Sequence, residues 1–176
     1  MKHPALRAKR RPPTLHACTD PPAPAPAPAT ATPGPSVASG SGSHPRIEQD
    51  ALGEVAVAET ALWGAQTQRA LHHFSLKADP MPYPVIEALA LIKSTAARAN
   101  AALGMLDAVQ AEAIARAGEE VLRGRHREAF RVSVWQSGSG TQTHMNMNEV
   151  LANRASELLG GGRGSARTVH PNDHVN

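Results

Sequence analysis

Apolar and polar positions divide the chain, from about residue 46 onward, into a short extended stretch followed by helices. Val55 and Val57 alternate with less apolar neighbours after a turn at Leu52-Gly53, which predicts a brief strand or an extended arm within residues 46–62. Residues 63–76 then change to a helical pattern, with apolar positions at Trp63, Ala70, Leu71 and Phe74.

Two long amphipathic helices are predicted next. The first begins at Pro84, a residue suited to the first turn of a helix, and ends at Gly104. Its apolar stripe consists of Val85, Leu89, Ile92, Ala96, Ala99 and Leu103. The second begins at Asp107, with Gln110 placed to complete a capping box, and ends at Gly124. Its stripe consists of Val109, Ala113, Ile114, Ala117, Val121 and Leu122. We interpret both stripes as core; the alternative is that one of them contacts a partner protein.

Composition favours packed helices over a β-sandwich, because 41% of the residues are apolar but only 3% are aromatic. The expected fold class is therefore mainly α with short β segments. A chain of 176 residues is long enough for one domain with a core. No stretch approaches the roughly 18 consecutive apolar residues of a membrane span, so no membrane interaction is expected. Cys18 is the only cysteine, which excludes an internal disulfide.

Residues 1–45 are rich in Pro and Ala and then in Gly and Ser, a composition that predicts a disordered tail; residues 46–176 are the expected folded domain. Residues 1–46 carry six basic residues and one acidic residue, so their net charge is +5, whereas the rest of the chain carries −2. Nucleic-acid binding is therefore not expected of the folded part. A cytoplasmic location is expected. The Arg-rich start leaves the mitochondrial matrix as the alternative, although Pro12 and Pro13 oppose a helical transit peptide.

The most informative stretch is a loop of small polar residues, Ser137–Thr141, that leads into a third helix at about 142–159. Gly138 and Gly140 let the backbone approach a ligand closely, and Ser139 and Thr141 offer hydroxyl groups. The first N–H groups of a helix favour an anion. The loop holds no Lys or Arg, so an anion would be bound by neutral donors. A flexible linker is the alternative, disfavoured because the following helix interleaves polar and apolar residues.

A second polar cluster spans residues 167–174, where Pro171 and Asn172-Asp173 predict a turn. From these residues alone a surface turn is the favoured interpretation, although Arg, His and Asn side chains could hold a small carboxylate. His170 and His174 have no Cys pair or HExxH motif beside them, so no metal site is expected. A basic cluster at residues 123–127 is interpreted as a complement to a helix dipole, in preference to a phosphate site.

The motifs WQSGSGTQTHMNMNEVLANRASELLGG and VHPNDHVN, with LWGAQTQRALHHF and RIEQDALG, resemble the class II fumarases of the fumarase/aspartase superfamily. The resemblance extends from about Arg46 to Asn176. It implies a mainly helical N-terminal domain of the fumarase/aspartase fold, without the central helical bundle. It also implies a metal-independent, cofactor-free homotetramer that interconverts fumarate and (S)-malate in the citric acid cycle.

The same resemblance implies roles for individual residues. Ser139, Gly140 and Thr141 would bind a substrate carboxylate and help to hold the water molecule. A second dicarboxylate site would consist of Arg167, His170, Pro171, Asn172 and Asp173. No catalytic residue is assigned, because the family's catalytic His and Ser motifs follow the point where this sequence stops. We therefore expect the chain to be inactive on its own. One departure is His144, which stands where the family pattern has Asn.

Two alternatives stay open. The first is a relative of aspartate ammonia-lyase, whose loop usually has Ala where Ser139 stands. The second is a non-catalytic paralogue that binds a dicarboxylate or contacts a full-length subunit.

Overall fold

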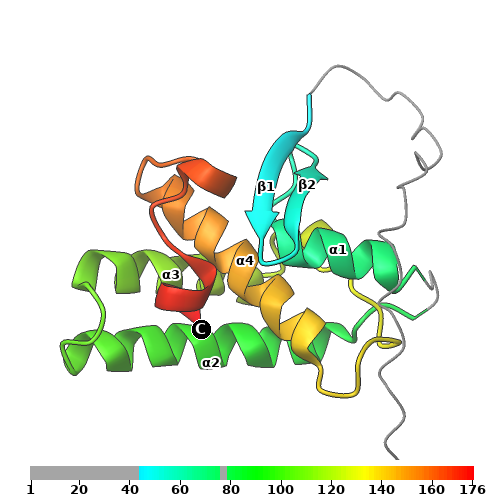
Figure 1. Cartoon of the computed structure of the whole chain (residues 1–176). Coiled ribbons are helices and arrows are strands. Elements are labelled where there is room, and N and C mark those ends of the chain that lie inside the picture. The colour runs from blue at the N-terminus through cyan, green and yellow to red at the C-terminus, as the bar shows by residue number, and fades with distance from the viewer. Residues whose placement is uncertain (1–43, 76–78) are drawn as a thin grey trace, which may run out of the picture. The chain divides into compact units, whose positions relative to one another are not determined.

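The computed structural model describes residues 44–75 and 79–176. All but the last two residues of the expected disordered tail, including Cys18, lie outside the described part. The described chain is mainly helical with short β segments, as predicted, and its two strands form one hairpin (Figure 1). Its strands and main helices are β1 (Arg46–Asp50), β2 (Gly53–Val57), α1 (Ala65–His73), α2 (Tyr83–Ala102), α3 (Ala108–Leu122) and α4 (Thr141–Leu158). Three short helical turns are η1 (Arg127–Ala129), η2 (Gly164–Ala166) and η3 (Pro171–Val175). None of the helices in the described part has the length and apolar character needed to cross a bilayer.

The strand predicted around Val55 is half of an antiparallel hairpin. β1 and β2 pair from Arg46 opposite Val57 to Asp50 opposite Gly53. The Asp50 side chain accepts a hydrogen bond of 2.8 Å from the Leu52 backbone N–H, and Gly53 takes a positive φ of 107°. Glycine adopts this backbone conformation readily, so the turn ends at Gly53.

Helices α2 and α3 pack together, but α2 does so through a face different from the predicted one. Ile86, Ala90 and Ala97 are buried, with 1%, 0% and 3% of their surface exposed. The predicted stripe is largely open to solvent: Val85 is 42% exposed, Ile92 60% and Leu103 72%. The prediction of a core stripe was therefore wrong for α2. This helix is apolar on more than one side, so periodicity alone could not identify the packed face.

Small residues decide which face of α2 is packed. A Cβ atom added to Gly118 of α3 would lie 2.0 Å from the Ser94 hydroxyl and 3.2 Å from the Ala90 carbonyl oxygen. The two helices therefore approach at a distance that only small side chains permit. The stripe predicted on α3 is confirmed at Ala113, Ile114, Ala117 and Val121, but its two ends, Val109 and Leu122, are exposed.

Asp107 caps α3 as predicted, since its carboxylate accepts hydrogen bonds from the backbone N–H groups of Val109 (2.9 Å) and Gln110 (3.0 Å). The capping box is not completed. The Gln110 side chain instead donates to the Thr168 carbonyl at 3.2 Å, which attaches the C-terminal segment to α3.

The central element is α4, which lies across the α2–α3 pair and contacts α1 and η3 (Figure 1). Met147, Val150 and Leu151 are fully buried. α4 also holds α1 in place, because α1 has no side-chain cap of its own. The buried Glu149 carboxylate accepts hydrogen bonds from the N–H groups of Gly64 (2.9 Å), Gln66 (2.8 Å) and Thr67 (3.0 Å). Burial raises the pKa of Glu149, and these donors oppose that rise by stabilising the charged form.

Candidate functional site

The Ser137–Thr141 loop forms the entrance to α4, which begins at Thr141, one residue earlier than predicted. Gly140 takes a positive φ of 69° at the N-cap position and contributes no side chain to cap the helix. One amide at this end is satisfied by the protein, because the Gln136 side chain accepts a 3.0 Å hydrogen bond from the Thr143 N–H. Within the described residues the N–H groups of Thr141 and Gln142 make no hydrogen bond. Two donors at the positive end of the helix dipole are therefore available to an anion.

The hydroxyl groups of the loop form a continuous hydrogen-bonded chain. The Ser137 hydroxyl donates to the Gln142 side-chain oxygen at 2.7 Å. Its oxygen lies 2.9 Å from that of Ser139, which in turn lies 2.9 Å from the Thr141 hydroxyl oxygen. The structure thus brings Ser139, Gly140 and Thr141 together, and Ser139 and Thr141 are exposed to solvent. These hydrogen bonds orient the hydroxyl groups, which lie outside the core.

A cavity of about 410 Å³ opens beside this loop, between the hairpin, α1 and the start of α4. Its lining is mostly apolar and includes Thr141, Gln142 and Met145. Arg69 also lines it, but the guanidinium group is bound to the Asp50 carboxylate at 2.7 Å and to the Gly53 carbonyl at 2.8 Å. The cavity is large enough for a small organic ligand, and its arginine is already paired.

Sequence analysis missed a cation that contacts the first part of α4. Nζ of Lys93, in α2, lies 2.8 Å from Nε2 of His144, the fourth residue of α4. Lys93 is only 7% exposed. Burial lowers the pKa of Lys93; burial and then the Lys93 charge lower the pKa of His144. Lys93 precedes the loop by more than 40 residues inside an apolar helix, so only its unusual place among apolar neighbours could have singled it out.

The second predicted cluster, at residues 167–174, includes a short helical turn. Pro171–Val175 forms a short helical turn of the π type. The His170 ring nitrogen Nδ1 lies 3.3 Å from the backbone nitrogens of Asn172 and Asp173 and caps this turn. His170 also lies 3.1 Å from the Asp173 carboxylate. His170, Asn172 and Asp173 are exposed, whereas Pro171 is buried.

Arg167 has its contacts elsewhere. Its Nη1 atom lies 3.4 Å from the Glu48 carboxylate and 3.5 Å from the Asn153 side-chain oxygen. Glu48 is 3% exposed, and a buried carboxylate requires a cation or hydrogen-bond donors. The described contacts therefore join Arg167 to the hairpin and α4, and they do not join its guanidinium group to His170.

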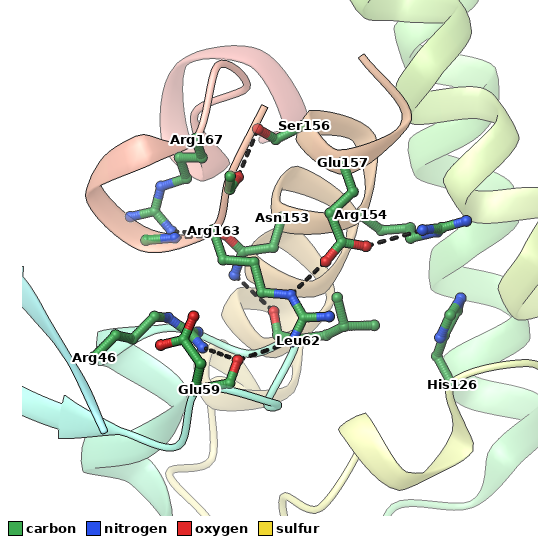
Figure 2. Close-up of polar contacts among 12 residues, drawn as sticks. Arg46, Glu59, Leu62, His126, Asn153, Arg154, Ser156, Glu157, Arg163 and Arg167 are labelled. Carbon is green, nitrogen blue, oxygen red and sulfur yellow. Dashed lines mark hydrogen bonds and ion pairs between the residues drawn. The ribbon is translucent and has the colours of Figure 1, made fainter. Parts of the chain in front are cut away.

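Polar residues in the C-terminal half of α4 belong to a network that connects distant segments (Figure 2). Asn153 donates a 2.7 Å hydrogen bond to the Leu62 carbonyl and accepts one of 3.2 Å from the Gly164 N–H. Figure 2 shows Arg163 between the Glu157 carboxylate and the backbone of Glu59, to whose carbonyl it donates at 3.1 Å.

Arg154 holds the adjacent α3. It binds both carboxylate oxygens of Glu120, at 2.6 and 2.9 Å, and this contact lowers the pKa of Glu120 to about 2. Two residues of the basic cluster at 123–127 also make contacts within the protein. His126 lies 2.7 Å from Glu120. The Arg127 guanidinium carbon is 3.7 Å from the Tyr83 ring centroid. These contacts favour structural roles over a phosphate site. In the part of the chain that the structure describes, no group of three or more His, Cys, Asp or Glu side chains could hold a metal ion.

Comparison with known proteins decides the family. The model of the family described as Lyase matches residues 53–176. The chain belongs to this lyase family. It is 59% identical over 131 residues to the class II fumarate hydratase of Bordetella parapertussis and 60% identical over the same length to that of Nitrosomonas europaea. Each alignment covers 74% of this chain and 28% of the relative.

Solved structures agree with this assignment. The crystal structure of class II fumarase from Schistosoma mansoni matches with a TM-score of 0.72 and 47% identity, over 75% of this chain and 28% of that one. A fumarate lyase:delta crystallin from Brucella melitensis matches with a TM-score of 0.72 and 44% identity, over 75% of this chain and 31% of that one. The resemblance to class II fumarases and the predicted fold are therefore confirmed, and the chain spans less than a third of the length of these relatives.

Proposed function

We propose that this lyase-family chain supplies the carboxylate-binding loop of a class II fumarate hydratase, which reversibly hydrates fumarate to (S)-malate in the citric acid cycle. One observation carries the proposal: the Ser139 and Thr141 hydroxyls adjoin two unused N–H groups at the start of α4. This set of donors fits one end of a small dicarboxylate.

The chemistry of the reaction explains why neutral donors suit this place. In the dehydration direction a base removes a weakly acidic proton from a carbon next to a carboxylate, and negative charge accumulates on that carboxylate. Fixed N–H and O–H donors stabilise this charge without having to reorganise. Ser139, Gly140 and Thr141 would bind the carboxylate, and the two hydroxyls would help to hold the water that is added. No base is assigned within this chain.

We further propose that the chain is inactive by itself and acts within a homotetramer that needs no metal or other cofactor. It spans 28% of the fumarate hydratases that it resembles, so the groups that move protons would come from sequence beyond the matched region. The second dicarboxylate site remains a proposal for the exposed His170, Asn172 and Asp173, with Pro171 shaping the turn. Arg167 would have to exchange its contact with Glu48 for the ligand. We place the enzyme in the cytoplasm, with the mitochondrial matrix as the alternative.

A chimera tests the proposed function. Residues 46–176 would replace the matching segment of the Nitrosomonas europaea class II fumarate hydratase, and fumarate hydration would be measured. We expect an active chimera in which Ser139→Ala or Thr141→Val lowers kcat/KM by about 100-fold or more. The isolated chain serves as the inactive reference. A folded chimera that does not hydrate fumarate, or one indifferent to both loop substitutions, would contradict the proposal. Release of ammonia from aspartate would instead favour the aspartate ammonia-lyase alternative.

The exposed face of α2 favours a second candidate, a subunit-contact role. Val85, Ile92 and Leu103 are between 42% and 72% exposed and repeat along one side of the helix. Such a surface favours a protein partner, and the proposed partner is a full-length class II fumarate hydratase subunit. Co-expression followed by size-exclusion chromatography tests this role. Ile92→Lys should abolish co-elution, and a chain that never co-elutes would contradict it.

A further inference from the structure

The Ser137–Thr141 loop contains no cation, but a buried ammonium group reaches the first turns of the helix that follows it. Lys93 is 7% exposed, and its Nζ atom lies 2.8 Å from Nε2 of His144. This is the one polar contact that the ammonium makes within the described residues, and none of their carboxylates forms an ion pair with it. The arginines that belong to α4 or contact it in the described part are paired: Arg154 with Glu120, Arg163 with Glu157, and Arg167 with Glu48.

A buried cation without an acidic partner is costly to maintain. Charged groups leave water only when ion pairs or hydrogen bonds compensate for the lost hydration. The one described partner of the ammonium is the imidazole of His144, whose Nε2 atom lies 2.8 Å from Nζ. Burial lowers the pKa of Lys93, as expected for an ammonium with no carboxylate nearby to oppose the effect. The site therefore carries positive charge that a bound anion would stabilise.

The position of this charge relates it to the loop. His144 and Thr141 are three residues apart on α4, so they are neighbours on its surface, with Cβ atoms about 5–6 Å apart. Lys93 meets α4 at His144, which follows Thr141 by three residues, and the N–H groups of residues 141 and 142 make no hydrogen bond in the described part of the chain. A carboxylate bound by these donors would lie about one helical turn from the position at which the ammonium meets α4, a separation shorter than the Debye length of about 8 Å at physiological salt.

We propose that Lys93, held in position by His144, is the cation of the carboxylate-binding loop and makes it selective for dianionic small dicarboxylates over neutral analogues of the same shape. The inference rests on the proposed function and adds a specificity-determining residue outside the loop. Lys93 acts through its charge. His144 is a positioning residue, which explains how a titratable ring is accommodated where the family pattern has Asn.

Ligand binding to the full 176-residue chain tests the inference. Succinate, an unreactive dicarboxylate, and succinamide, its neutral diamide, would be titrated by calorimetry. We expect Lys93→Gln to weaken succinate binding about tenfold, Lys93→Arg to retain most of the affinity, and neither to change succinamide binding. Arg98→Gln is the matched control, because it removes a charge from an exposed position of the same helix. It should change the succinate affinity less than twofold. Far-ultraviolet circular dichroism would confirm that each variant is folded.

The ring of His144, observed by NMR, gives a second readout that depends on electrostatics and not on folding. Succinate should raise the pKa of His144 and succinamide should not, while Lys93→Gln should raise it in the free protein. Equal succinate affinity in wild type and Lys93→Gln, with Ser139→Ala weakened, would overturn the role of Lys93 and leave the proposed function standing. No succinate binding by the wild type, and no response of His144, would contradict both.

Discussion

The polar residues at the entrance to α4 and those in its later half make different kinds of contact. From Glu149 onward, Glu149, Asn153 and Ser156 bind backbone groups of segments far away in the sequence or beyond the helix end. At the beginning, Ser139 and Thr141 bind each other, and two backbone N–H groups make no hydrogen bond within the described residues. Polar groups that are already hydrogen-bonded within the protein cannot easily bind a ligand. The start of α4 is therefore the better candidate for a ligand site.

The largest effect is expected at Glu149. Glu149→Ala would leave three N–H groups at the start of α1 without an acceptor, and two of them, those of Gly64 and Thr67, are buried. We expect the free energy of unfolding to fall by about 3–5 kcal/mol, measured by urea denaturation. Glu149→Gln should lose less, because its amide oxygen can still accept. An unchanged midpoint for Glu149→Ala would show that this half of α4 does not hold the fold together.

The Arg154–Glu120 contact should produce a pH dependence of stability. The pKa of Glu120 is lowered from 4.5 to about 2, chiefly by its hydrogen bonds with Arg154. A carboxyl group with a lowered pKa stabilises the folded state above its unfolded pKa, and this contribution is lost as pH falls from about 4.5 toward 2. Glu120→Gln should remove that slope and lower the free energy of unfolding at pH 7 by about 2–3 kcal/mol. Parallel acid titrations that coincide for both proteins would contradict the ion pair.

A serine-to-alanine substitution can be made both at the loop before α4 and near the C-terminal end of α4. Ser156 is fully buried, donates to the Gly162 carbonyl at 2.7 Å and accepts from the Thr168 N–H at 2.9 Å. Ser156→Ala should therefore lower the free energy of unfolding by about 1–2 kcal/mol. Urea denaturation measures the change.

Ser139→Ala, which removes an exposed hydroxyl, should change the free energy of unfolding by less than about 0.5 kcal/mol. It should nevertheless weaken succinate binding. If Ser139→Ala proves as destabilising as Ser156→Ala, the loop is a structural element and the contrast between the two ends disappears.

Much of this fold could be predicted because its local signals agree. Asp107 caps α3, and Gly140 and Gly160 bracket α4. The packed face of α2 could not be predicted. Val85 and Ile86 are equally apolar, and the choice between them depends on how closely Gly118 lets α3 approach. Such a tertiary effect has no local signature.

The candidate site also has a part that could be predicted from the sequence and a part that could not. The loop residues are adjacent in sequence, so their grouping at 139–141 was visible before the fold was known. Lys93 and Arg167 depend on contacts across the fold. Lys93 meets His144 because α2 and α4 cross, and Arg167 is drawn to Glu48 because that carboxylate is buried on β1. Long-range charge partners of this kind follow from packing, which the order of residues in one segment does not reveal.

The central claim is that the start of α4 binds a small dicarboxylate while its later polar residues serve the fold. A titration of the ¹⁵N-labelled chain with fumarate, followed amide by amide, tests it most directly. We expect the largest shifts at Gly140, Thr141 and Gln142, with Asn153 and Ser156 unmoved. Shifts confined to residues 153–164, or a loop that does not respond to saturating fumarate, would contradict it.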